Sequence, residues 1–117
     1  MESNLVAILP CNDLDRTEAF FMRLGFKREQ GSSGDYRMLA DGYGAHIHLN
    51  QAVQGWLVPG SNPFGLYLYR RDVDELAAAF REEIDAGPSD TPWGMYEFAV
   101  NAPDDTLVRV GWPTRLR

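Results

Sequence analysis

Two histidines two residues apart form the most chemically suggestive pair in the chain. His46 and His48 flank Ile47 in a stretch typical of a strand, and Asn50 follows at the same spacing. Because successive side chains of a strand point to opposite faces, His46, His48 and Asn50 should share one face. Two imidazoles are half of a metal site, for which Glu97 is the candidate third ligand. The alternative is that both histidines line a wet cavity; a general-base role for His48 lacks an identifiable partner.

A charged pair is predicted inside a hairpin near the C-terminus. Residues 95–100 and 107–111 are typical of two strands joined by a tight turn. Alternation places Glu97 opposite the apolar row that contains Phe98, and Arg109 opposite the row of Val108 and Val110. Glu97 and Arg109 therefore share the face turned away from the helix. They could form an ion pair there, since carboxylate and guanidinium geometries match, or bind groups of a ligand.

The three tryptophans of the chain have different expected roles, and Trp93 is the candidate for stacking on a flat ligand. Trp93, between Pro92 and Gly94, precedes the hairpin strand and is expected to flank the mouth of a cavity, or alternatively to pack at a dimer interface. Trp56 lies near a connector and is expected to cover the cavity. Trp112 lies in the same strand row as Val110 and is expected to be a core residue. Aromatic stacking contributes roughly 0.5–1.5 kcal/mol per pair beyond area burial, which suits a planar ligand.

Composition limits the class of protein. The chain has 117 residues, 44% hydrophobic and 24% charged, which is ordinary for one globular domain. The net charge of −6 argues against a nucleic-acid partner and against an anionic membrane surface. No apolar run approaches the length of a membrane span, so a cytoplasmic protein is the simplest expectation. The single cysteine, Cys11, is expected to be a small core residue rather than a catalytic thiol.

The first half of the chain has the pattern β-α-β-β-β. An apolar run from Leu5 to Leu9, ended by Pro10, predicts a buried strand, and Asn12 or Asp13 can cap a following helix. Apolar residues at helical spacing continue until Gly25 ends the helix. Three strands should follow, at residues 26–30, 36–40 and 45–51, separated by two glycine-containing turns.

The same pattern begins again after a connector at residues 58–63. A strand is predicted at residues 64–69, and a helix that Asp72 and Glu75 begin as a capping box extends to Ile84. Asp13-Leu-Asp15 is echoed about sixty residues later by Asp72-Val-Asp74, which indicates an internal repeat. We therefore predict an α+β fold of two βαβββ modules, residues 1–57 and 64–117, whose mixed sheet forms a cup within a single domain.

Several short motifs, taken together over nearly the whole chain, resemble the vicinal oxygen chelate superfamily (glyoxalase, bleomycin resistance, dioxygenase), and within it the bleomycin-resistance type. The turn at residues 102–105, with Leu107 after it, resembles the family's Asp-Pro-Asp-Gly, with Ala102 and Asp105 in place of its first Asp and its Gly. The other matching segments are Leu9-Pro10, Asn12 to Arg16, Phe20-Phe21, Leu24-Gly25-Phe26, Asp72 to Leu76, and Pro92 to Phe98.

The resemblance implies a site and its residues. The superfamily's metal-ligand positions fall near Val6, His48, Leu66 and Arg109, of which only His48 can ligate, so no metal or other cofactor is expected. In bleomycin-resistance proteins a tryptophan stacks on the drug, opposite an aromatic residue from the other subunit of a homodimer. The resemblance implies that Trp93 corresponds to this tryptophan and Tyr36 to the aromatic residue opposite it.

The expected function is metal-independent sequestration of a planar aromatic ligand, an antibiotic among the candidates, in a cavity at a homodimer interface. Its expected ligand-binding residues are Trp93, Tyr36, His46, His48, Glu97, Arg109 and Trp56. Because Arg70, Arg71 and Arg109 add cations to the second module, bleomycin itself is less favoured. The alternatives are a metal-dependent enzyme that uses His48 and Glu97, and a domain that has no small-molecule ligand.

Overall fold

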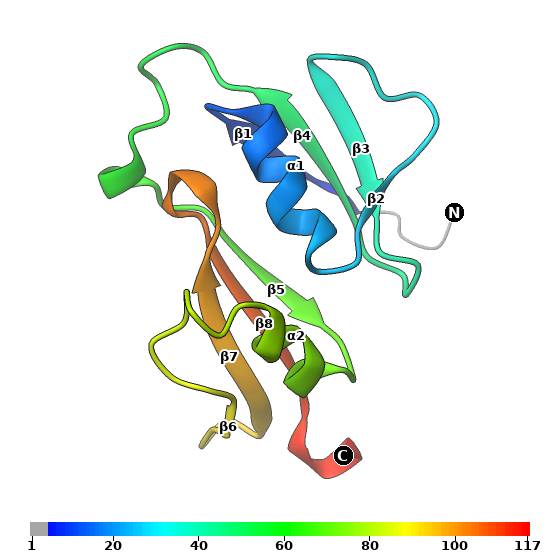
Figure 1. Ribbon diagram of the computed structural model, residues 1–117, viewed down its shortest axis with the longest axis vertical. Helices are drawn as coiled ribbons and strands as arrows, with labels where there is room; N and C mark the ends of the chain where they lie inside the picture. The colour runs from blue at the N-terminus through cyan, green and yellow to red at the C-terminus, as the bar shows by residue number, and fades with distance from the viewer. Residues whose placement is uncertain (1–4) are drawn as a thin grey trace. The chain divides into compact units, whose positions relative to one another are not determined.

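The computed structural model describes residues 5–117. The chain forms two compact units, and the boundary between them along the sequence lies between Asn62 and Pro63. Each unit contains one four-stranded mixed sheet and one α-helix (Figure 1). The two sheets have equivalent strand orders, β1-β4-β3-β2 and β5-β8-β7-β6. The predicted α+β class and the internal βαβββ repeat are therefore confirmed.

The first unit contains a parallel pair at one edge of its sheet. Strand β1 runs parallel to β4, whereas β3 is antiparallel to both β4 and β2. Its elements are β1 (Ala7–Cys11), α1 (Leu14–Met22), β2 (Lys27–Arg28), β3 (Tyr36–Ala40) and β4 (His46–Gln51), followed by a 3₁₀ turn at Pro59–Ser61.

The first strand begins and ends two residues later than predicted. It starts at Ala7, leaves Leu5 84% exposed, and continues through Pro10 to Cys11. Proline lacks the N–H that a central strand must donate, but β1 is an edge strand that pairs with β4 alone. Pro10 therefore does not end the strand.

Helix α1 begins and packs as its sequence predicts. The Asp13 side chain accepts a hydrogen bond from the backbone N–H of Arg16 at 3.1 Å, which caps the first turn. Phe20 and Phe21 are buried, and α1 packs against β4. After the helix, Gly25 adopts a φ of 90°, a conformation that glycine tolerates best.

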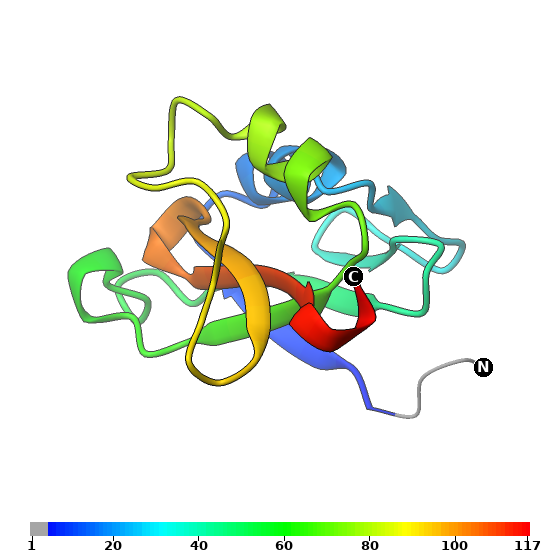
Figure 2. The ribbon, with the colours of Figure 1, turned by 90° about the horizontal axis from the view of Figure 1, so that it is seen from below.

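The second unit repeats this arrangement. Strand β5 runs parallel to β8, and β7 is antiparallel to both β8 and β6. Figure 2 shows α2 over one face of this sheet, and no helix covers its opposite face within the second unit. Its elements are β5 (Gly65–Tyr69), α2 (Val73–Ala79), β6 (Ser89–Asp90), β7 (Met95–Asn101) and β8 (Leu107–Pro113), with 3₁₀ turns at Pro103–Asp105 and Thr114–Leu116.

Helix α2 departs from the prediction at both ends. It stops at Ala79 instead of reaching Ile84, and the Asp72 side chain makes no capping hydrogen bond. The Asp72 carboxylate instead accepts hydrogen bonds from Arg70 Nε at 3.0 Å and Arg70 Nη2 at 2.8 Å. Because the Arg70 side chain is buried, its charge requires a counterion, and this requirement takes the carboxylate from the helix end. The predicted capping box was therefore wrong.

Trp112 lies on the helix-covered side of the second sheet, where it pairs across the strands with Tyr96. It is half-buried, and the Arg71 guanidinium lies 5.4 Å from its ring centroid.

None of the helices within residues 5–117 has the length and hydropathy that a membrane span requires.

Candidate functional site

The candidate site lies on the face of the second sheet that α2 does not cover, which we call the open face. Strand register places two rows of side chains there. Tyr67, Arg109 and Ala99 lie side by side in one row, and Tyr69, Gly111 and Glu97 lie side by side in the next. The alternation predicted for Glu97 and Arg109 is therefore present, and it brings both to one face with two tyrosines.

Glu97 is the centre of this group. It is 5% exposed, and its carboxylate accepts three hydrogen bonds from side chains. Oε1 accepts one from Tyr67 Oη at 2.8 Å and one from Trp93 Nε1 at 3.0 Å, while Oε2 accepts one from Arg109 Nη1 at 3.1 Å. A buried carboxylate with these donors is fully compensated and fixes the orientation of three surrounding side chains.

These contacts set the protonation of the group. Burial pushes the pKa of Glu97 upward, but hydrogen bonds from Trp93, Tyr67 and Arg109, with the charge of Arg109, bring that pKa below its ordinary value. Burial, and then the hydrogen bond to Glu97, raise the pKa of the Tyr67 phenol. Near neutral pH, Glu97 is therefore a carboxylate, and Tyr67 is a phenol that donates to it.

Gly111 makes the Tyr67–Glu97 hydrogen bond possible. Glycine lies between Tyr69 and Glu97 in the register, in the central strand β8. A Cβ at this position would overlap the Tyr67 hydroxyl and lie 2.9 Å from the Glu97 Cβ. The missing side chain thus leaves the space through which Tyr67 reaches across β8 to Glu97.

Aromatic surface surrounds this polar centre. Trp93 is 65% exposed although its indole N–H is bonded to Glu97, so the ring is held in place and remains open to solvent. The Tyr67 and Tyr69 rings lie with centroids 5.0 Å apart. The Arg109 side chain is 44% exposed. Such a surface can stack on a flat molecule and offer it charged hydrogen-bond donors.

The histidines of the first unit lie on the face of its sheet that α1 does not cover. Tyr36 Oη lies 2.7 Å from His48 Nδ1, and the two rings meet edge to face. His46 Nδ1 lies 3.2 Å from Glu29 Oε1. The structure thus brings Tyr36 and His48 together and gives His46 a different partner.

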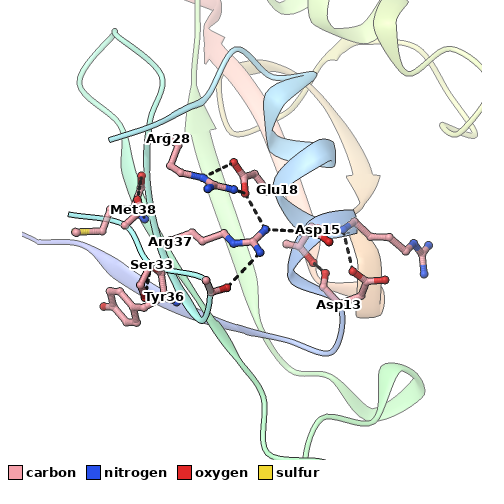
Figure 3. Close-up of polar contacts among 12 residues, drawn as sticks. Asp13, Asp15, Glu18, Arg28, Ser33, Tyr36, Arg37 and Met38 are labelled. Atoms are coloured by element: carbon pink, nitrogen blue, oxygen red, sulfur yellow. Dashed lines mark hydrogen bonds and ion pairs between the residues drawn. The ribbon is translucent and has the colours of Figure 1, made fainter. Parts of the chain in front are cut away.

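Charge on the opposite side of that sheet forms a separate network. Arg37 Nη1 donates to Asp15 at 2.7 Å and to Glu18 at 2.9 Å, and Arg28 forms a two-pronged pair with Glu18. Figure 3 shows Arg37 reaching toward α1, while Tyr36 and Met38 on the same strand point away from it. This network ties β3 and β2 to the helix, and its side chains leave the histidine face free of these charges.

Trp56 is isolated from the other predicted site residues of its unit. It is 81% exposed in a turn, where its backbone N–H donates to Val53. No hydrogen bond or ring contact joins its side chain to Tyr36, His46 or His48 in the part of the chain that the structure describes.

The family-related metal positions do not fit a metal. Register places Ile8 beside His48 and Tyr67 beside Arg109, whereas Leu66 pairs with Val108 toward the helix side. Ile8 has no donor atom, the Tyr67 phenol already donates to Glu97, and a guanidinium repels cations. Residues 5–117 contain no group of three His, Cys, Asp or Glu that could hold a metal ion.

Sequence reasoning missed Tyr67, Tyr69 and Gly111. Alternation within β5 was available as a signal, since Tyr67 and Tyr69 lie on opposite sides of Leu68. It could not show which row of β5 meets Arg109, because that depends on the register of a parallel pair from distant segments. A glycine within a strand is a recognised sign of close approach, and Gly111 was open to that interpretation.

Comparisons with known proteins agree with this fold. The model of the Glyoxalase/Bleomycin resistance protein/Dioxygenase superfamily matches residues 4–110. A solved bleomycin-binding protein, complexed with bleomycin, is 27% identical with a TM-score of 0.75, and the match covers 94% of this chain and 98% of that chain. A bleomycin resistance determinant encoded on the transposon Tn5 is 26% identical with a TM-score of 0.77, over 95% and 98% of the two chains.

A more distant structure shares the fold. The antibiotic-binding protein TnmS3 from Streptomyces sp. CB03234 is 24% identical with a TM-score of 0.68, and the match covers 92% of this chain and 93% of that chain. Comparison with curated proteins gives no match. On its family model and its fold, the chain belongs to the glyoxalase/bleomycin resistance protein/dioxygenase superfamily.

Proposed function

We propose that this protein binds a planar aromatic small molecule and acts by sequestering it, with no bond made or broken and no metal required. An antibiotic of the bleomycin type is among the candidate ligands, because two similar structures, at 26% and 27% identity over nearly their whole length, are a bleomycin resistance determinant and a bleomycin-binding protein.

The observation that carries this proposal is the Trp93 indole. An exposed ring normally samples several rotamers, and immobilising it costs binding free energy. The hydrogen bond to the buried Glu97 carboxylate, at 3.0 Å, holds the ring before any ligand arrives. Stacking on a ring already in position loses less side-chain entropy, so Trp93 is well suited to capture a flat molecule.

We further propose a cytoplasmic homodimer with the ligand cavity at the subunit interface. Strands β1 and β5 are edge strands, each paired on one side, and pairing of chains is one way of covering such edges. Tyr36, His46, His48 and Trp56 of the first unit are the candidates for the remaining contacts with the ligand.

Tryptophan fluorescence tests this function. The protein is titrated with metal-free and with copper-loaded bleomycin, and the same preparation is submitted to elemental analysis. Saturable quenching at about one ligand per subunit is expected, with strong loss in Trp93→Ala and retention in Trp112→Phe. The second variant changes a tryptophan on the helix-covered side. Circular dichroism checks that both variants fold, and analytical ultracentrifugation measures the oligomeric state.

The opposite results identify the other classes. Quenching that survives Trp93→Ala would place the binding elsewhere and remove the indole from the proposal. Stoichiometric zinc, nickel or iron without quenching would reject sequestration and favour a metal-dependent enzyme. If neither quenching nor metal is found, bleomycin is excluded as the ligand. Calorimetric titration with naphthalene derivatives would then decide whether the open face binds any planar ligand.

A further inference from the structure

The open face carries one cation whose donors are not all used. Arg109 Nη1 donates to Glu97 Oε2, and among residues 5–117 no hydrogen bond is formed by its Nε or Nη2. The other two arginines of interest are occupied on the helix-covered side or in the core. Arg70 is buried against Asp72, and Arg71 lies over the Trp112 ring.

Glu97 holds Arg109 without consuming it. A guanidinium offers five N–H donors in a rigid fork, and one of its edges can bind a carboxylate through two parallel hydrogen bonds. The Glu97 carboxylate is also occupied by Tyr67 and Trp93, so it attracts Arg109 through one oxygen only. A fork anchored through one N–H, 44% exposed, retains the free edge that bidentate recognition requires.

The neighbours of Arg109 leave room for a ring beside that edge. In the register, Arg109 lies between Tyr67 and Ala99. Ala99 is exposed and has only a methyl group as its side chain, so no large side chain stands on that side of the guanidinium. Tyr67, whose ring lies at 46° to that of Tyr69, supplies an aromatic wall on the other side. A flat ring against this wall would carry its acidic group to the fork.

We propose that the ligand of the open face is a planar aromatic anion, whose carboxylate or sulfonate group binds the free edge of Arg109 while its ring lies against the aromatic side chains. This inference rests on the proposed function and narrows it to one ligand class. It reverses the preference that the net charge of −6 would suggest, because local donors within a partly desolvated site outweigh the distant, screened charge of the surface.

Three matched naphthalene probes test the inference by isothermal titration calorimetry. Naphthalene-2-carboxylate, the neutral naphthalene-2-carboxamide and the cation 2-naphthylmethylammonium present the same ring with different charge. We expect the carboxylate to bind at least about tenfold more tightly than either of the others, as charge-assisted hydrogen bonds predict. Arg109→Gln should abolish that preference and Arg109→Lys should reduce it, because lysine keeps the charge near Glu97 but loses the fork.

The control is Arg81→Gln, which removes the same charge from an exposed position beyond the end of α2. It should leave the preference unchanged. Since Arg109→Gln removes the counterion of a buried carboxylate, a Glu97→Gln/Arg109→Gln double variant provides a neutral pair if the single variant unfolds, and it should also show no preference for the anion.

The outcomes separate this inference from the proposed function. If all probes bind with equal affinity and lose it in Trp93→Ala, sequestration stands and the anionic ligand is rejected. If anion preference survives Arg109→Gln, another site recognises the acid, and the inference is rejected. If anion affinity falls as the protein concentration rises, a second copy of the chain occupies the open face, and the inference is rejected. If no probe shows Trp93-dependent binding, the anionic ligand is rejected, and sequestration fails as well if bleomycin also causes no quenching.

Discussion

Gly111 and Tyr67 are complementary in shape: the ring of one occupies the space where the other has no side chain. The tyrosine crosses the central strand to donate to Glu97 at 2.8 Å. Tyr67 and Trp93 donate to the same Glu97 oxygen, and Arg109 donates to the other. The absence of a side chain at Gly111 therefore affects the hydrogen bonds of the whole open face.

Gly111→Ala should therefore destabilise the protein by about 1–3 kcal/mol, because the new methyl group overlaps Tyr67 and crowds Glu97. Urea unfolding measures the change. In a Tyr67→Ala background the same substitution should cost markedly less, since the ring is gone. Gly87→Ala is the control, because a Cβ there meets nothing within 4 Å. Equal costs in the two backgrounds would show that Tyr67 does not occupy the Gly111 space.

Glu18 should make stability sensitive to acid. The hydrogen bond from Arg28 lowers its pKa below the ordinary 4.5, burial opposes this effect, and Arg37 adds to the lowering. A lowered folded-state pKa contributes stability above pH 4.5, which is lost as the pH falls through the folded-state value. Glu18→Gln should cost about 1–3 kcal/mol near neutral pH and flatten the acid limb of stability against pH.

Asp15→Asn is the matched control for Glu18. Both carboxylates accept from Arg37 Nη1, but the Asp15 side chain is 87% exposed and that of Glu18 only 11%. Exposed ion pairs contribute about 0–1 kcal/mol, so Asp15→Asn should have a small effect that weakens further in salt. A larger loss for Asp15→Asn than for Glu18→Gln would reverse the assigned order of importance.

Tyr67 should resist ionisation in alkali. Burial and then the Glu97 hydrogen bond raise its pKa, so the folded state holds this proton more tightly than the unfolded chain. The stabilisation is present below the unfolded-state pKa of 10.0 and is lost as the pH rises toward the higher folded-state value. Glu97→Gln removes the negative acceptor, so the Tyr67 phenol should ionise at a lower pH than in the parent protein, while burial still keeps its pKa raised.

Phenolate absorbance measures this difference directly. The ionisation at lower pH should be missing from a Tyr67→Phe/Glu97→Gln double variant, which assigns the signal to Tyr67. If Glu97→Gln leaves the ionisation of the phenols unchanged, burial alone holds the Tyr67 proton and the hydrogen bond contributes nothing to its pKa.

The turn between β7 and β8 contains removable strain. Asp104 and Asp105 have φ values of 66° and 61°, in the left-handed region that disfavours residues with a Cβ. Asp105→Gly should stabilise the protein by about 0.5–1 kcal/mol, and Asp105→Ala should not, because alanine keeps the steric cost. Thermal unfolding compares the two variants. Equal effects of glycine and alanine would attribute any gain to the lost charge instead of the backbone.

Sequence patterns predicted the fold well where the structure of a segment depends on residues close together in the sequence. Alternation placed Glu97 and Arg109 on one face, and the Asp13 side chain caps α1 as its local sequence predicts. Asp72 has an equivalent sequence context but lies two residues from a buried arginine, which takes its carboxylate. That competition depends on the burial of Arg70, which no local pattern reveals.

The open face was predictable only in part for a similar reason. Its two charges lie on adjacent antiparallel strands joined by one turn, so their register follows from the hairpin. Tyr67 enters from β5, whose parallel pairing with β8 is set by the tertiary fold, and Gly111 acquires its meaning from that neighbour. The sequence thus predicts the pair, and the tertiary fold adds the aromatic wall and the gap beneath it.

The strand order shared by the two units places different chemistry at equivalent points of the two sheets. Tyr36 and His48 stand diagonally across β3 and β4, and Glu97 and Arg109 stand at the same diagonal across β7 and β8. The same diagonal thus holds a phenol with an imidazole in one unit and a carboxylate with a guanidinium in the other. Because each unit has its own sheet, a substitution that changes the ligand chemistry of one open sheet face leaves the hydrogen bonds of the other unit's sheet in place.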